Sequence, residues 1–189
     1  MKFIHSVGIV CLCLYCLPMA TVNAASDHKI FFSCTDYHCD AGQMVTLTAS
    51  QWQSIRDLFA ADTSPAEERE NIRQSIALLE NTVGAITGTW RDLGGNVRGA
   101  GQIGQLDCIS ESKNTSTFLH LLFDDGLIKW HDIEERRVRS PLFFNVHWAA
   151  VIVERSNGEH FAVDSWFLDN GQPPSIQPLR DWLLGRRMD

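Results

Sequence analysis

The chain has 189 residues, and its 16 basic and 23 acidic side chains give a net charge of −7 with histidine neutral. An acidic surface argues against nucleic acids and anionic lipids as partners, because both would be repelled. Without the N-terminal segment considered next, about 165 residues remain, a length that suits one domain with a substantial buried core.

The first 25 residues predict a secretory signal peptide. Lys2 gives a positive start, residues 3–19 are mostly apolar, and Val22-Asn23-Ala24 fits the small-residue cleavage rule. We therefore expect an exported protein, periplasmic or extracellular, whose residues 26–189 form a single domain. An uncleaved membrane anchor is the alternative, although the apolar core is short for a span of about 20 residues. No later apolar run is long enough to span, so we expect no stable membrane span after cleavage.

The cysteines predict one disulfide and one free thiol. Cys34 and Cys39 lie close together in the sequence, so in an oxidising compartment they are expected to pair. Such a short ring stabilises a fold by about 2 kcal/mol. A metal site at these two residues, or pairing of either with Cys108, is the alternative. Three further cysteines leave with the signal peptide: Cys11, Cys13 and Cys16.

The first part of the mature chain predicts two helices. Ser50 is expected to cap a short helix with one apolar face: Trp52, Ile55, Leu58 and Phe59. A second helix start follows, with Ser64 as cap, Pro65 in the first turn and Glu67 closing a capping box. Beyond it, apolar residues recur at steps of four and three and predict one buried stripe: Ile72, Ile76, Leu79, Val83 and Ile86.

Residues 92–105 are rich in glycine and predict a loop with unusual backbone angles. We expect these glycines to bring the backbone close to whatever binds at Cys108. Asp107 is placed to cap the next helix, which Gly126 would end.

The second half of the chain predicts strands. Leu127–Ile133 and Val146–Glu154 are apolar and β-branched, and Asn157-Gly158 signals a hairpin turn before Phe161–Phe167. A short final helix is expected around Trp182. Helices followed by an antiparallel sheet indicate the α+β class.

Cys108 is the candidate nucleophile, because a lone thiol with a histidine and a carboxylate downstream is the pattern of thiol catalysis. The start of a helix favours a thiolate by only about 0.3–1 kcal/mol, so a nearby histidine is required. His147 is the best candidate base, since it opens an apolar strand that we expect to be central. Close spacing of metal ligands is absent from the sequence, so no zinc site is predicted.

Asp164 is the candidate that orients His147, because an acid inside an apolar strand needs a buried partner. A two-residue turn at Asn157-Gly158 would pair Asp164 with Val151, so a bulge or a strand offset is needed to bring it to His147. Asp169 is the reserve candidate for this role.

An oxyanion site needs donors near the attacked carbonyl. The backbone N–H of Cys108 is one candidate. Either Gln102 or Gln105 is a candidate for the second donor, and a water-facing position in the loop is the alternative for both.

The sequence resembles a known group of enzymes at these positions. Cys108 opening a helix, His147 opening a strand and Asp164 on the adjoining strand are similar to the transglutaminase-like and papain-like thiol enzymes. Within them, the chain most resembles the bacterial periplasmic transglutaminase-like cysteine peptidases. The stretch Leu106–Thr115, with His147-Trp148 and Val163–Phe167, also resembles a group of exported bacterial proteins. The resemblance covers about residues 100–172.

This resemblance implies a papain-like fold, with a helical N-terminal half packed on an antiparallel sheet. It also implies an exported thiol hydrolase or acyltransferase that acts on an amide bond of a protein or peptide, with Cys108, His147 and Asp164 as the triad. No cofactor is expected, although some relatives bind calcium through acids beside the cysteine, here Asp107 and Glu111. The alternative is a non-catalytic binding or envelope-structural module on the same fold, in which exposed aromatic side chains line a recognition groove: Trp148, Trp166 and Phe167.

Overall fold

The structure is a computed structural model that describes residues 28–61, 64–140 and 146–186. Its strands are β1 (Lys29–Cys34), β2 (Gly42–Leu47), β3 (His131–Arg139), β4 (His147–Glu154), β5 (His160–Asp164) and β6 (Ser175–Pro178). Its helices are α1 (Ala49–Asp57), α2 (Pro65–Thr87), α3 (Cys108–Asp124) and α4 (Leu179–Leu183), with short 3-10 turns η1 (Tyr37–Cys39) and η2 (Thr89–Arg91).

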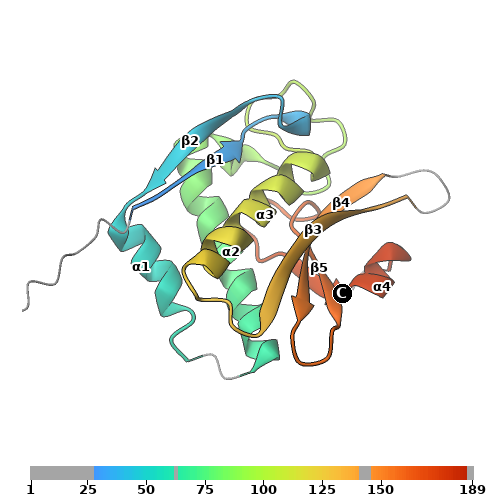
Figure 1. The fold of residues 1–189 in the computed structure, drawn as a ribbon. Coiled ribbons are helices and arrows are strands. Elements are labelled where there is room, and N and C mark those ends of the chain that lie inside the picture. The colour runs from blue at the N-terminus through green and yellow to red at the C-terminus, as the bar shows by residue number, and fades with distance from the viewer. Residues whose placement is uncertain (1–27, 62–63, 141–145, 187–189) are drawn as a thin grey trace, which may run out of the picture.

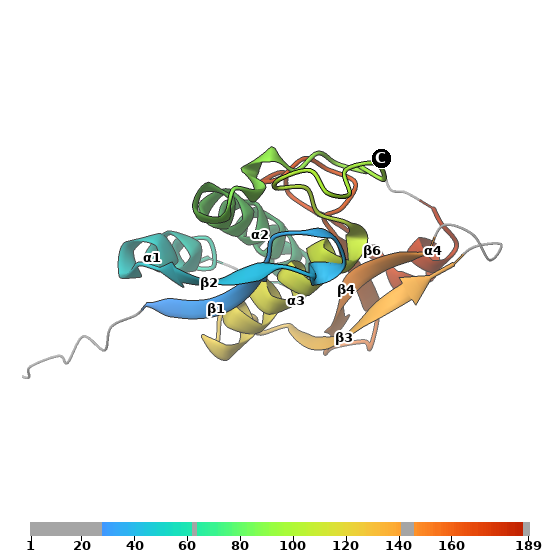
Figure 2. The same cartoon turned by 90° about the horizontal axis from the view of Figure 1, so that it is seen from above.

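Helix α3 crosses the middle of the molecule, between α2 and a four-stranded antiparallel sheet of order β3-β4-β5-β6 (Figure 1). Strands β1 and β2 form a separate antiparallel pair, and β1 and η1 both contact α3. Seen from above, α3 and α4 lie on opposite sides of the four-stranded sheet (Figure 2). The first turn of α3, which carries Cys108, is therefore enclosed from several directions.

The two faces of the sheet have different neighbours, because successive side chains of a strand point to opposite sides. One row packs in the main core with α2 and α3: Ala150, Ile152, Phe161 and Val163. Ala149 and Ala162 belong to the other row and pack against Trp182 of α4. His147 and Asp164 have the same parity as this second row, so they lie on the α4 side of the sheet.

Two of the three predicted helix starts are confirmed. Ser64 caps α2 by accepting the N–H of Glu67, and Asp107 caps α3. The prediction that Ser50 caps the first helix is wrong. Thr48 caps α1 instead, in a capping box with Gln51, so the helix already contains Ser50 in its first turn.

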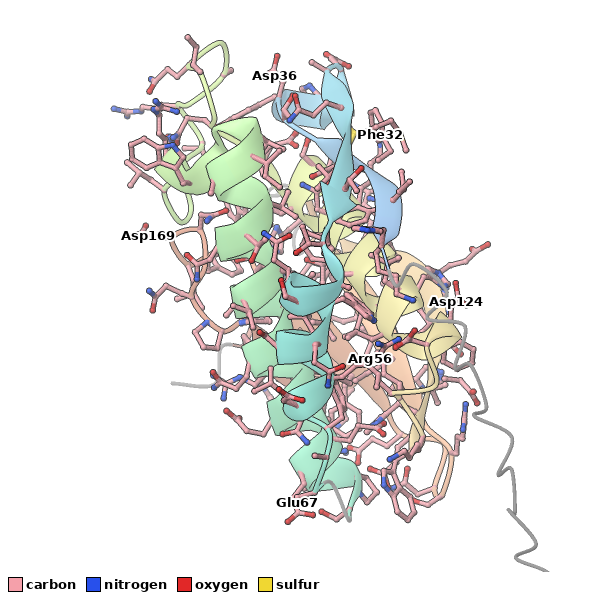
Figure 3. All side chains as sticks on the ribbon, turned by 90° about the vertical axis from the view of Figure 1, so that its left-hand side faces the viewer. Phe32, Asp36, Arg56, Glu67, Asp124 and Asp169 are labelled. Atoms are coloured by element: carbon pink, nitrogen blue, oxygen red, sulfur yellow. A yellow bond between two sulfur atoms is a disulfide. The ribbon has the colours of Figure 1, made fainter. Side chains whose placement is uncertain are left out.

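The expectation of a helical N-terminal half is corrected, because the described chain begins with the β1–β2 hairpin. Alternate side chains of this hairpin turn inward, which is the pattern of a half-buried strand: Phe31, Val45 and Leu47. The side chains between them are exposed: Ile30, Phe32 and Met44 (Phe32 is labelled in Figure 3).

The predicted strands are found with shifted ends. β4 spans nearly the expected residues, whereas β3 begins only at His131 and β5 already ends at Asp164. The turn between β4 and β5 has four residues, 155–158, instead of two, as the hydrogen bond from Glu154 N–H to the Glu159 carbonyl shows. The sequence analysis missed β6, a short edge strand that ends on Pro178.

The structure confirms the α+β class with antiparallel sheets. In the three described ranges, no helix is both long and apolar enough to cross a membrane. The predicted signal peptide, residues 1–25, lies outside the described residues.

Candidate functional site

Cys108 is the first residue of α3, and its thiol is free and partly exposed. The carboxylate of Asp107 accepts the Ser110 N–H at 2.9 Å and caps the helix. The same oxygen accepts the His38 N–H of η1 at 3.0 Å. Asp107 therefore satisfies one of the free N–H groups at the start of α3 and also connects this helix to η1.

The predicted bridge between Cys34 and Cys39 is present, and we call residues 34–39 the disulfide clasp. The clasp holds the first two turns of α3 through side chains of that helix. Cys39 N–H donates to Ser110 Oγ at 2.8 Å, and the Ser110 hydroxyl donates to the carbonyl of Asp36, labelled in Figure 3. Asn114 accepts the N–H of Cys34 at 2.8 Å and donates back to its carbonyl at 3.1 Å. The N-terminal hairpin thus positions the candidate nucleophile.

The sulfur of Cys108 lies against the first residues of β4. It is 4.0 Å from the carbonyl oxygen of Val146 and accepts a hydrogen bond from the N–H of Trp148. These two groups belong to the residues on either side of His147. The thiol therefore rests beside the backbone of the residue that carries the predicted base.

The resting side chain of Cys108 is a thiol. Burial raises the pKa of Cys108 above its ordinary value, and the negative charges of Asp107 and Asp164 add to this. The N–H groups of Trp148 and of Cys108 itself point at the sulfur and act in the opposite direction, but they do not outweigh burial. A reaction at this sulfur therefore needs a base to remove the proton.

His147 and Asp164 form a buried pair, with Nε2 of the imidazole 2.7 Å from Oδ2 of the carboxylate. Val163 pairs with Ala150, which places Asp164 level with Ala149 and diagonal to His147. The longer turn supplies the strand offset that the sequence analysis required. Both side chains are only 4% exposed.

Trp182 of α4 is a third member of this pair. Its Nε1–H donates to the same Asp164 oxygen at 2.7 Å. The tautomer of His147 that carries its hydrogen on Nε2 can donate to this carboxylate and has its lone pair on Nδ1. Nδ1 is buried without a partner among the described residues.

Three aromatic rings enclose the imidazole of His147. The ring centroids of Phe167, Trp166 and Trp182 lie 4.7, 5.0 and 5.7 Å from it. The sequence analysis treated Trp166 and Phe167 as exposed groove residues, but they are half-buried against His147. This enclosure keeps bulk water from the His147–Asp164 hydrogen bond.

The reserve orienter and the two candidate glutamines lie elsewhere. Asp169, on the loop labelled in Figure 3, accepts the Gly94 N–H at 2.9 Å and does not bond His147. Gln105 is buried, and its amide accepts the Leu93 N–H at 3.3 Å and donates to the carbonyl of Arg91, so it holds the glycine-rich loop together. Gln102 is exposed and donates to the carbonyl of Arg98 at 3.3 Å within the same loop.

The glycines of this loop allow close approach to other protein segments. Gly104 has a φ of +79°, and a Cβ there would lie 2.4 Å from the carbonyl oxygen of Gly88. A Cβ on Gly94 would lie 2.5 Å from the carbonyl oxygen of Phe167. At Gly94 and Gly104 the backbone therefore comes close to other parts of the protein, and not to a ligand at Cys108 as we expected.

The two calcium candidates have separate surroundings. Asp107 caps α3, whereas Glu111 is buried with Asp92 and Glu80. Burial is the main cause that raises the pKa of Glu111 well above its ordinary range, and the charges of Glu80 and Asp92 add to it. Burial likewise raises the pKa of Glu80 to about 7 and that of Asp92 to about 6. The described ranges hold no group of three His, Cys, Asp or Glu side chains arranged for a metal ion.

Comparison of the chain with protein-family models, with curated proteins and with solved structures found no match.

Sequence reasoning missed two residues of this region, Trp182 and Arg136. Trp182 was assigned only to a final helix, and no local pattern connects an indole of α4 with Asp164. Arg136 lies on β3 and donates to the Ile109 carbonyl at 3.3 Å, next to Cys108. The one available signal was the charged run 134–137 inside a strand, which is unusual for a fully paired segment.

Proposed function

We propose that the protein is an exported thiol hydrolase or acyltransferase that acts on an amide bond through Cys108, His147 and Asp164. The observation that carries this proposal is the open Nδ1 of His147. This nitrogen is buried, its imidazole is oriented by Asp164 at 2.7 Å, and the Cys108 sulfur contacts the backbone of the residues on either side of His147. The resemblance to transglutaminase-like and papain-like thiol enzymes agrees with this assignment.

In the proposed reaction, His147 Nδ1 takes the proton of Cys108 as the sulfur attacks the carbonyl carbon of the amide. Asp164 stabilises the imidazolium that forms, and Trp182 holds the carboxylate in place. Because burial raises the pKa of Cys108, the attack requires a base, and His147 has this role in the proposal.

The second half of the reaction returns the proton. The tetrahedral intermediate carries its negative charge on the former carbonyl oxygen, and the Cys108 N–H, which already points at the sulfur, is the nearest donor for it. His147 then protonates the leaving amine, and a thioester remains on Cys108. Water releases the acid in hydrolysis, whereas a second amine forms a new amide in acyl transfer.

Acyl transfer from 4-nitrophenyl acetate tests this proposal without a known substrate. We expect release of 4-nitrophenol with acetylation of Cys108, detected by mass spectrometry. Cys108→Ala should abolish the modification, and His147→Ala should slow it about 10²-fold or more, the usual contribution of a general base. His28→Ala, an exposed histidine before β1 that lies outside the candidate site, is the matched control and should keep the wild-type rate. Equal acetylation rates in wild-type protein and His147→Ala would contradict the proposal.

A binding or envelope-structural module is the second candidate function, and the raised pKa of Cys108 is the observation that favours it. A thiol that stays protonated has no catalytic use by itself. This candidate predicts no acetylation of Cys108 and no effect of His147→Ala. The same experiment therefore separates the two functions.

A further inference from the structure

Arg136 lies where the pairing of β3 with β4 is irregular. The register shifts between Glu134 and Arg137, and such a bulge turns a side chain out of the regular alternation. Arg136 Nη1 donates to the Ile109 carbonyl at 3.3 Å and to Ser112 Oγ at 2.9 Å, both in the first turns of α3. The bulge thus brings a guanidinium to the helix that begins with Cys108.

Two of the residues that contact the Arg136 guanidinium, Ile109 and Trp148, are also neighbours of Cys108. Ile109 follows Cys108 in the chain, and the Arg136 guanidinium carbon lies 5.0 Å from the ring centroid of Trp148, whose N–H bonds the Cys108 sulfur. Burial lowers the pKa of Arg136, while attraction to the Cys108 sulfur opposes this. A cation therefore stands beside the candidate nucleophile, where the other charges that act on it, Asp107 and Asp164, are negative.

Arg136 has donors left for a ligand. A guanidinium carries five N–H groups, and both hydrogen bonds of Arg136 leave from Nη1, so within the described residues Nη2 and Nε have no protein acceptor. Arg136 and Trp148 also form one end of a surface hollow of about 450 Å³, bordered by Ser116 and His120 of α3 and by Ile133, Glu134 and Glu135 of β3. The charge of Glu134 is offset by His160 at 3.1 Å and by Arg137 at 3.5 Å. A group in this hollow would reach Arg136 close to Cys108.

We propose that Arg136 recognises a carboxylate of the substrate beside the amide that Cys108 attacks. The two N–H groups on one edge of an arginine guanidinium match the two oxygens of a carboxylate, and the cation–π contact with Trp148 restrains the guanidinium. This inference rests on the proposed function and deepens it, because it makes the substrates acidic: amides whose neighbouring residue carries a side-chain or terminal carboxylate.

Alkylation by two small reagents tests this proposal. Iodoacetate carries a carboxylate and iodoacetamide is its neutral counterpart, so the ratio of their rates at Cys108 measures recognition of the charge. Relative to the same ratio for N-acetylcysteine, we expect the protein to favour iodoacetate. Arg136→Gln should lower the ratio about tenfold, as loss of a charge-assisted hydrogen bond does. The iodoacetamide rate alone should stay within about twofold of wild type.

Arg137→Gln is the matched control, because this neighbouring arginine is directed to Glu134 and not to α3. It should leave the ratio unchanged. Arg136→Lys keeps the charge without the fork and should give an intermediate ratio, which keeps the test valid if Arg136→Gln unfolds.

The outcomes separate the failure of this inference from that of the proposed function. An unchanged ratio in Arg136→Gln overturns the inference. Equal slowing with both reagents also overturns it, since Arg136 would then act on the thiolate and not on a carboxylate. Failure of the acetylation experiment would overturn the proposed function, whatever the ratio.

A second pair of reagents identifies the source of the carboxylate. N-acryloyl-glycine carries a terminal carboxylate, and N-acryloyl-aspartic acid α-amide carries one on its side chain. Each is compared with its neutral amide at Cys108. If Cys108 reacts faster with the acid than with the amide of one pair, and Arg136→Gln removes this difference, that pair identifies the type of substrate carboxylate. Equal rates for acid and amide in both pairs would contradict the inference.

Discussion

The fold contains two buried histidine–carboxylate pairs, and they differ in the atoms that they leave unpaired. His131 Nδ1 lies 2.8 Å from Glu68, and His147 Nε2 lies 2.7 Å from Asp164. His131 and Glu68 are fully buried, and the second pair is nearly so. Distance and burial therefore do not distinguish a structural pair from a candidate catalytic one.

The His131–Glu68 pair is closed. Glu68 also accepts the N–H groups of Lys129, Trp130 and His131, and the other nitrogen of His131 bonds Arg69 at 3.1 Å. This pair joins α2 to the start of β3, and it uses both nitrogens of the imidazole. It has no atom left for chemistry.

The His147–Asp164 pair is open. Three buried polar atoms here have no partner among the described residues: His147 Nδ1, Asp164 Oδ1 and Trp166 Nε1. Since an unpaired buried polar atom destabilises a fold by about 1–3 kcal/mol, such a cluster calls for an explanation. The two pairs differ in their unpaired atoms, and the pair that has them is the one to which we assign the proposed reaction.

The largest expected effect comes from removing each histidine in turn. His131→Ala should lower the free energy of unfolding by about 3–5 kcal/mol, because it breaks a fully buried pair, leaves the Glu68 carboxylate with backbone donors alone and opens a cavity beside it. His147→Ala should cost less than about 2 kcal/mol, since Asp164 keeps its bond from Trp182. Urea denaturation of both variants measures the difference. If His147→Ala is as destabilising as His131→Ala, the distinction between the closed and the open pair fails.

The next largest effect is the dependence of stability on pH. The pKa of the acid in the closed pair is lowered, whereas the pKa values of the buried acids near the open pair are raised. Burial raises the pKa of Glu68, but hydrogen bonds from His131 and from backbone N–H groups outweigh it, so the pKa is lowered. Glu68 therefore stabilises the fold above its ordinary pKa and less as the pH falls. Glu80, Asp92 and Glu111 have raised pKa values, so their contribution is full near pH 4 and is lost as the pH rises to about 7.

We therefore expect the free energy of unfolding to decrease by about 3 kcal/mol or more from pH 4.5 to pH 7.5, since each pKa unit corresponds to about 1.4 kcal/mol and the pKa of Glu80 alone rises from 4.5 to about 7. Urea midpoints across this range measure it. Glu111→Gln removes one charge of the cluster and should flatten the curve. A midpoint that rises with pH in the wild type would show that the buried acids do not hold their protons.

The smallest effect concerns Trp182, whose indole N–H donates to the carboxylate of the open pair. In the closed pair, backbone N–H groups donate to the carboxylate instead. Trp182→Phe removes the bond to Asp164, and we expect acetylation of Cys108 to slow about tenfold, equal to about 1.4 kcal/mol. The midpoint of the rate against pH should move upward, because a carboxylate that has lost a donor holds the imidazole proton more strongly. Trp90→Phe, at an exposed tryptophan, is the control. A slower rate with an unmoved midpoint would mean that Trp182 only fills space.

Local patterns in the sequence predict local structure well. Ser64 and Asp107 are helix caps, Cys108 begins α3, and β4 spans almost the expected residues, because capping chemistry and apolar runs act within a few residues. Ser50 failed as a cap because Thr48 competes for the same role two residues earlier. The β1–β2 hairpin was missed because its outward side chains are apolar and hide the alternation.

The candidate site was predictable only in part. Asp164 needed a partner, and the sequence named His147, but the four-residue turn that brings them together depends on hydrogen bonds around Glu154 and not on Asn157-Gly158 alone. Gln105 was misassigned because a polar side chain near a nucleophile looks the same in sequence whether it faces substrate or holds a loop. Long-range contacts, such as that of Trp182 with Asp164, leave no local pattern.

The disulfide clasp ties the geometry of the nucleophile to the redox state of its surroundings. Thiols at Cys34 and Cys39 join only where oxidants are available, and in a reducing compartment they stay apart. The start of α3 would then lose the covalent ring that holds the Cys39 N–H against Ser110 and the His38 N–H against Asp107. We therefore expect the contacts of the disulfide clasp with the start of α3 to be fully formed only in an oxidising environment.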